Sequence, residues 1–102
     1  MSEELLIDVG YMIRASKRVD HKERVLKHST TFIKFLENNS LTKQKLIGNT
    51  EYLDDDFKLF ESHLTDVGIS FFDKTYFKWV GKIDKGAAPT DTTFLERELA
   101  KL

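Results

Sequence analysis

Between Ile69 and Ile83 the apolar residues recur at intervals of three and four, and this period constrains the fold more than any other feature. The stripe consists of Ile69, Phe72, Tyr76, Trp79, Val80 and Ile83. Such spacing keeps the residues on one face of an α-helix for about four turns. Thr65 stands where an N-cap is needed. The whole chain has one proline and five glycines, so few residues interrupt helices. The sequence therefore predicts a helical fold.

Two more helices are predicted before this one. Residues 5–13 carry apolar side chains at helical spacing, with Ser2 as N-cap and Gly10 either weakening the helix or letting a neighbour approach closely. The next helix begins after Asp20, which forms a capping-box-like pair with Glu23. It ends at residues 38–40, Asn-Asn-Ser, whose side chains compete for backbone hydrogen bonds.

The middle of the chain is harder to assign. Residues 41–47 are expected to add one or two helical turns before the glycine at position 48. In the segment 51–64, Phe57, Phe60 and Leu64 suit a helix, whereas residues 57–59 alternate like a strand. We favour the helix for this segment.

A last short helix is predicted from Thr93, which pairs with Glu96 in a second capping-box-like pattern. Its apolar side carries Leu95, Leu99 and Leu102. The expected fold is therefore all-α or mainly α, a compact bundle of about five to six helices with a possible short strand near 57–60. At this length we expect residues 1–102 to form a single globular domain.

The composition limits the compartment and the chemistry. The chain has no cysteine, which excludes disulfides and thiolate sites and fits a reducing environment. It begins Met1-Ser2-Glu3-Glu4, acidic where a secretory signal is basic, and no apolar run approaches the roughly 20 residues needed to cross a bilayer. We expect a cytoplasmic protein that does not enter membranes.

No residue pattern indicates an enzyme. The histidines His21, His28 and His63 are the only candidate bases for nucleophilic catalysis, and each is interpreted as a solvated surface residue. The run Asp54-Asp55-Asp56 could bind a hard cation, but it lacks the alternate spacing of a calcium loop, and capping of a following helix explains it better. The glycines are isolated, so no phosphate loop is present. We predict no catalytic residues, no metal and no cofactor.

Two aromatic residues lie off the predicted apolar stripe. Phe71 and Phe77 flank the face that carries Phe72 and Tyr76. An exposed aromatic residue of this kind can anchor an interface. Burial on two sides of the helix is the alternative, and we favour it for both residues.

Charge is segregated along the chain. Between Tyr11 and Lys34 seven basic residues face two acidic ones, and between Glu51 and Asp66 six acidic residues face one lysine, although the whole chain carries a net charge of only −1. The basic residues are Arg14, Lys17, Arg18, Lys22, Arg24, Lys27 and Lys34. The acidic residues are Glu51, Asp54, Asp55, Asp56, Glu61 and Asp66. Segregated charge of this kind steers and selects binding partners.

An acidic surface on a small protein without catalytic residues is typical of a protein that neutralises another protein. We expect the six acidic residues to bind a basic toxin domain, with a nuclease as the natural target because its cleft attracts phosphate and therefore carboxylates. In overall character the chain resembles small bacterial immunity proteins, including those paired with contact-dependent inhibition toxins. That resemblance is one of type, short, cysteine-free and helical, and it assigns a role to no particular residue.

Two alternatives remain open at this point. Residues 40–46 followed by the Leu-Thr-x-x-Gly segment at 64–68 suggest a winged-helix regulator that binds nucleic acid, but no basic recognition helix follows and the net charge is near neutral. Alternatively, the basic and acidic blocks pair with one another, either within a monomer or between two copies in a weak homodimer.

Overall fold

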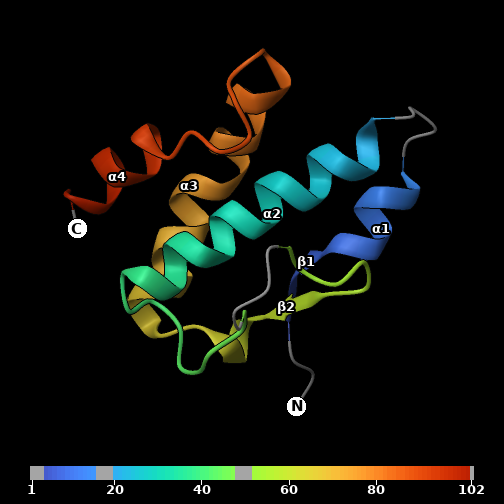
Figure 1. The fold of residues 1–102 in the computed structure, drawn as a ribbon. Helices are drawn as coiled ribbons and strands as arrows, with labels where there is room; N and C mark the ends of the chain where they lie inside the picture. The colour runs from blue at the N-terminus through green and yellow to red at the C-terminus, as the bar shows by residue number, and fades with distance from the viewer. Residues whose placement is uncertain (1–3, 16–19, 48–51, 102) are drawn as a thin grey trace.

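The computed structural model describes residues 4–15, 20–47 and 52–101. In chain order the elements are strand β1 (Leu5–Asp8), helices α1 (Val9–Arg14) and α2 (His21–Asn38), strand β2 (Lys58–Phe60), a 3₁₀ turn η1 (Glu61–His63), and helices α3 (Asp66–Asp84) and α4 (Thr93–Leu99). The long helices α2 and α3 lie at the centre, with α4 on one side and α1 with the two strands on the other (Figure 1). The fold is mainly helical, as the sequence predicts.

Aromatic rings form the core between α2 and α3. The Phe32 ring of α2 lies 5.9, 5.0 and 5.6 Å from the ring centroids of Phe72, Tyr76 and Trp79. The Trp79 indole N–H also donates a hydrogen bond to the carbonyl of Asp91 at 2.9 Å, which ties down the segment before α4. The apolar stripe of the sequence is therefore the core face of α3.

The first predicted helix, over residues 5–13, is a strand in its first half. The backbone of β1 pairs with β2 in an antiparallel two-stranded sheet. The helix begins only after Asp8, whose carboxylate accepts a hydrogen bond from the N–H of Tyr11 at 3.0 Å and caps α1. Ser2, the predicted N-cap, lies outside the described residues.

The helix predicted over residues 41–47 is wrong, because contacts distant in sequence take up the backbone groups of this segment. The carbonyl of Leu41 accepts a hydrogen bond from the N–H of Thr65 at 2.9 Å. The Glu37 carboxylate accepts the N–H of Ile47 at 2.7 Å. With these partners the chain follows an irregular path across the end of α2.

The helix favoured for residues 51–64 is also wrong, and the alternative of a short strand near 57–60 is confirmed. Lys58 is exposed and Leu59 is fully buried, which is the alternation of a strand with one covered face. The described residues contain four α-helices, fewer than the five to six expected.

The later helices begin close to the predicted positions. Asp20 occupies the N-cap of α2, but its side chain makes no capping hydrogen bond. The Thr65 hydroxyl accepts the N–H of Gly68 at 3.0 Å and caps α3. The Asp91 carboxylate accepts both the N–H and the hydroxyl of Thr93, at 3.0 and 2.7 Å, before α4. Within the described ranges, no helix is long and apolar enough to cross a bilayer.

Candidate functional site

The predicted acidic surface is divided in two by strand β2. Five of its six residues are described, and Glu51 lies outside the described ranges. Three of the five precede β2, whereas Glu61 follows it directly and Asp66 opens α3. A strand rises about 3.3 Å per residue, so the two groups lie at opposite ends of the small sheet.

The first group, which we name the loop carboxylates, consists of Asp54, Asp55 and Asp56 in the turn before β2. The N–H of Phe57 donates to the Asp54 carbonyl at 3.1 Å, and the N–H of Val9 donates to the Phe57 carbonyl at 3.0 Å. The Asp55 carbonyl lies 3.4 Å from the position a Cβ on Gly10 would take, an ordinary contact distance, so the loop packs against α1. Because a strand follows the loop, the interpretation of these acids as caps of a following helix is wrong.

Among the described residues, only one loop carboxylate meets a cation of the basic block. Lys22 Nζ of α2 lies 2.7 Å from a carboxylate oxygen of Asp55, and both side chains are more than half exposed. Such a pair contributes about 0–1 kcal/mol. Asp54 and Asp56 are exposed and make no ion pair among the described residues. Pairing between the two blocks within the monomer therefore involves Asp55 in this loop.

The second group gathers around Glu61. Its N–H donates to the Glu4 carbonyl at 2.9 Å, which brings the two side chains together. A hydrogen bond that the protonated Glu61 carboxyl donates to the Glu4 side chain raises the pKa of Glu61, and partial burial and the negative charges of Glu4 and Asp73 act in the same direction. An approaching cation stabilises the charged form of a carboxylate whose pKa is raised in this way.

Helix α3 continues this acidic area. At 100° per residue, Asp66 and Asp73 project within about 40° of Phe77 around the helix axis. Both aspartates are exposed, and Phe77 is 74% exposed. We name the set of Asp66, Asp73 and Phe77, together with Glu4 and Glu61 beside them, the α3 surface.

The lysines of α3 project on the other side of Phe77, toward α4. Lys74 and Lys78 line a hollow of about 320 Å³ together with Glu98 of α4. Lys82 Nζ lies 5.0 Å from the ring centroid of Phe94, in a cation–π arrangement. These cations of α3 therefore lie near acidic or aromatic groups of α4, and the exposed Asp73 lines the same hollow as Lys74 and Lys78.

Much of the basic block is occupied within the fold. Lys27 Nζ lies 3.0 Å from Glu23 on the same helix. The Arg24 guanidinium donates to the carbonyl of Ile83 at 3.4 Å, at the end of α3. Two more basic residues, in the segment 16–19, lie outside the described ranges.

Each of the three histidines contacts another part of the chain. The prediction that all three lie on the surface is wrong for His28, which is buried. His21 hydrogen-bonds a backbone carbonyl of α1 at 2.7 Å, and His63 accepts a backbone N–H of β2 at 3.1 Å. His28 is only 7% exposed and meets the Trp79 ring edge-on at 6.1 Å. Burial lowers the pKa of His28 to about 4, with Asp84 opposing that shift. Among the described residues, no cluster of three or more histidines and carboxylates could hold a metal ion.

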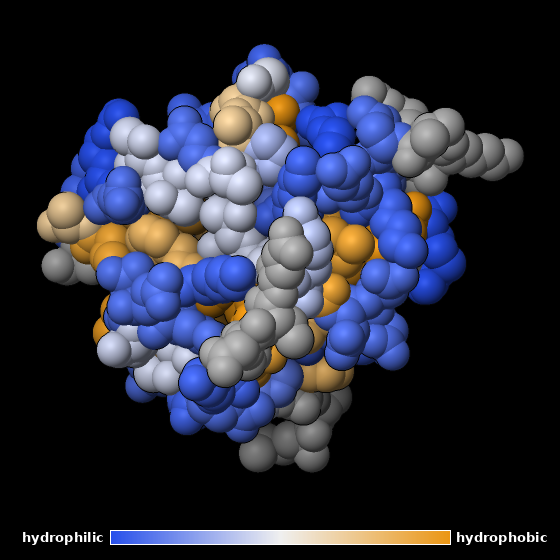
Figure 2. Space-filling view, viewed as in Figure 1, coloured by the Kyte–Doolittle hydropathy of each residue, from blue (hydrophilic) through white to orange (hydrophobic). Residues whose placement is uncertain are grey.

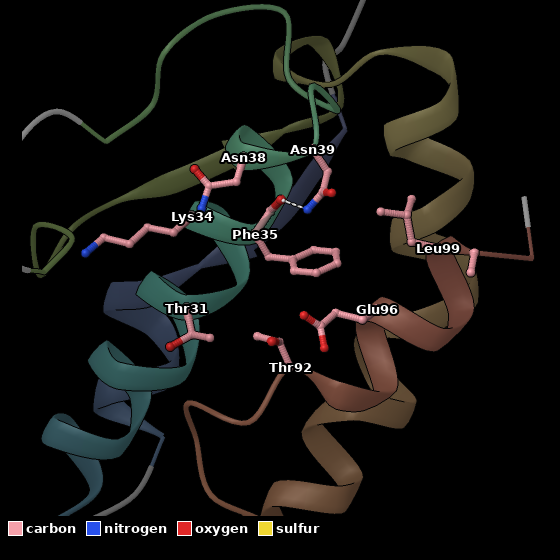
Figure 3. A pocket seen from close by; sticks show the side chains of 9 residues that line it. Thr31, Lys34, Phe35, Asn38, Asn39, Thr92, Glu96 and Leu99 are labelled. Carbon is pink, nitrogen blue, oxygen red and sulfur yellow. Dashed lines mark hydrogen bonds between the residues drawn. The ribbon is translucent and has the colours of Figure 1, made fainter.

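A cleft that the sequence does not predict lies between α2 and α4. It has a volume of about 600 Å³ and is lined by Thr31, Lys34, Phe35, Asn38, Asn39, Thr92, Glu96, Leu99 and Ala100. Phe35 and Glu96 point into it from the two helices, while Lys34 extends away from α4 (Figure 3). On the face seen in Figure 1, hydrophobic side chains show only in separate areas between hydrophilic ones (Figure 2). The lining of the cleft is partly polar and partly apolar, and its charged residues do not converge on one point.

Comparison with known proteins yields no match, since no family model, curated protein or solved structure resembles the chain significantly. The function can therefore be inferred only from the surface of the described residues.

Sequence reasoning missed Glu4 and Asp73 as members of the site, and for Phe77 it weighed an interface anchor but wrongly favoured burial, since the residue is 74% exposed. The position of Asp73, seven residues after Asp66 and thus on the same side of a helix, was a usable signal. The contact of Glu4 with Glu61 was not, because it depends on the pairing of β1 with β2.

Proposed function

We propose that this protein binds and neutralises a toxin whose active-site cleft is positively charged, with a nuclease as the leading target. The observation that supports the proposal is the exposure of the carboxylates that the sequence predicts to bind the partner. Of the five described, only Asp55 has a lysine or arginine counter-ion among the described residues. Carboxylates without internal counter-ions remain available to an external cation.

A nuclease fits this chemistry because its cleft is built to attract phosphates. Lysine and arginine side chains that neutralise phosphates also attract a cluster of carboxylates. The resulting field accelerates association by about ten to a thousandfold and makes it sensitive to ionic strength. A carboxylate-bearing protein can therefore block such a cleft without any catalytic group.

The carboxylates stand on ordered backbone, which favours tight binding. The loop carboxylates are held by the hydrogen bonds of Phe57 to Asp54 and of Val9 to Phe57. Asp66 lies in the first turn of α3, whose N-cap Thr65 is itself hydrogen-bonded to Leu41. Preorganised groups lose less entropy on binding than groups on a mobile segment.

The test uses the protein encoded by the reading frame next to that of this chain. Its expression alone should stop growth, and co-expression with this chain should restore growth. The purified pair should associate quickly at low salt, at least about tenfold faster than at high salt. No rescue and no binding with either neighbouring product would contradict the proposal.

Charge reversal identifies the carboxylates involved. The variants D54K/D56K and D66K/D73K each reverse the charge at two exposed aspartates. These aspartates form no ion pair among the described residues, and the Lys22–Asp55 pair stays intact. If carboxylates carry the binding, at least one of the two variants should slow association at low salt by about tenfold or more. Equal rates for both variants and the unaltered protein would exclude an electrostatic mechanism.

A further inference from the structure

Phe77 is exposed although it sits in the middle of the most apolar helix. Its ring is 74% exposed, whereas Phe72 and Tyr76, whose rings it touches edge-on at 6.3 and 5.4 Å, are 3% and 4% exposed. The fold thus gains little from this side chain. An exposed apolar side chain contributes favourable free energy only when a binding partner covers it and removes it from water.

The space around Phe77 is open on the helix. A Cβ on Gly81, one turn later, would meet no atom within 4 Å. No side chain at this position hinders a partner that approaches the ring from the C-terminal side. The helix therefore offers a protruding ring with no side chain at the position one turn after it.

Carboxylates border the ring on one side, and the exposed Lys74 and Lys78 lie on the other. Asp73 lies one turn before Phe77, and its charge reaches Glu61, which also contacts Glu4. Asp66 extends the same line toward the start of α3. An apolar centre with a charged border is the usual composition of a protein–protein interface.

We propose that the α3 surface is a docking site for a cationic protein partner, with Phe77 inserted into an apolar pocket and lysine or arginine side chains against Asp66, Asp73 and Glu61. The proposal rests on the proposed function, since it names the surface and the chemistry through which the toxin is held. It assigns the contact to this surface and not to the loop carboxylates.

Charge favours this partner over two others. A two-fold dimer through the same face would bring together two copies of a patch with more carboxylates than lysines, which a cationic partner avoids. Nucleic acid would bring phosphates to the same carboxylates and be repelled. A basic protein surface is the partner whose charge complements the α3 surface.

The experiment measures binding of synthetic peptides to the full-length ¹⁵N-labelled protein by amide shifts. One amphipathic 14-residue peptide contains only arginine and leucine, a second replaces leucine by serine, and a third replaces arginine by glutamate. We expect saturable binding of the arginine–leucine peptide alone, with the largest shifts at Asp73 and Phe77. Phe77→Ala should weaken it about 30-fold, as expected for a buried aromatic anchor.

Tyr11→Ala is the matched control, because Tyr11 is a second aromatic residue with 66% exposure, on α1. It should leave peptide affinity unchanged, and so should D54K/D56K. The proposal is overturned by no saturable binding, by equal affinity of the arginine–serine or glutamate–leucine peptide, or by equal loss in Tyr11→Ala. It is also overturned by a dimer in the absence of peptide that Phe77→Ala abolishes.

The toxin experiment separates this proposal from the proposed function. If the neighbouring toxin is neutralised equally well by Phe77→Ala and D66K/D73K, the function stands and the α3 surface is excluded. If the arginine–leucine peptide binds as expected but no neighbouring product is neutralised, the surface stands and the toxin-binding function is excluded.

Discussion

Gly68 lies directly against the backbone carbonyl of Leu41, so close that a Cβ at this position would overlap the oxygen. Gly68→Ala must therefore push the first turn of α3 away from the segment after α2. We expect this variant to lower the free energy of unfolding by about 1–3 kcal/mol, as overpacking of a filled site does. Urea denaturation followed by circular dichroism measures the change.

Gly81→Ala provides the control in the same helix. Its Cβ would meet no atom within 4 Å, and alanine is favoured over glycine in a helix interior by up to about 1 kcal/mol. We expect this variant to be more stable than the unaltered protein. A loss of stability in Gly81→Ala, or none in Gly68→Ala, would contradict the packing described here.

Thr30 holds the segment before β2 against α2. Its hydroxyl accepts a hydrogen bond from the N–H of Leu53 at 3.0 Å in a buried position. Thr30→Val keeps the shape but leaves this N–H without a partner, which costs about 1–3 kcal/mol. The free energy of unfolding of the variant, from urea titration, checks this value.

The neighbouring Thr31 serves as its control. Its hydroxyl donates to the carbonyl of Lys27 within α2 at 2.8 Å, and the residue is only partly buried. Because no other segment depends on this bond, Thr31→Val should change stability by less than about 0.5 kcal/mol. Similar losses of unfolding free energy in the two variants would show that the buried Thr30 hydrogen bond stabilises the fold no more than the Thr31 hydrogen bond does.

These contacts explain how far the sequence predicts the fold. Helices α2 and α3 are long and periodic, so local spacing identifies them. The pairing of Leu41 with Thr65 and of β1 with β2 joins segments more than twenty residues apart. No local pattern encodes such pairs, and the helices predicted over 41–47 and 51–64 fail for this reason.

The candidate site follows the same rule. The acidic block is visible in the sequence, but its division into two surfaces follows from strand β2, where the sequence favours a helix. Phe71 and Phe77 occupy similar positions beside the apolar stripe, and the sequence favours burial for both. The structure buries Phe71 because α2 places Phe35 against its ring at 5.6 Å, and leaves Phe77 uncovered.

His28 makes stability depend on pH. Burial lowers its pKa from 6.5 to about 4, with Asp84 opposing and Arg24 adding to that shift. The unfolded chain therefore takes up a proton first as the pH falls below 6.5. We expect the free energy of unfolding to decrease from pH 6.5 to about pH 4 and then to level off, by up to about 3 kcal/mol from this residue.

The His28→Leu variant isolates this contribution, because carboxylates also titrate in the lower part of that range. The difference in unfolding free energy between the two proteins should change with pH between 6.5 and 4 and stay constant above pH 7. Parallel profiles for His28→Leu and the unaltered protein would show that His28 titrates normally.

Phe71 and Phe77 should differ sharply when each is replaced by alanine. Phe71 is 1% exposed and stacks on Phe35, so Phe71→Ala should cost about 3–5 kcal/mol through lost burial and an unfilled cavity. Such a loss is a large share of the stability of a domain this size. Urea denaturation of both variants in parallel measures the two values.

Phe77→Ala should change stability by no more than about 0.5 kcal/mol, because most of its ring already lies in water and alanine favours the helix. A ring that the fold does not use is free to enter a pocket of another protein, which is what docking at the α3 surface requires. If Phe77→Ala instead destabilises the protein as much as Phe71→Ala does, the ring supports the core. The loss of peptide binding in that variant would then reflect unfolding and not the removal of an anchor.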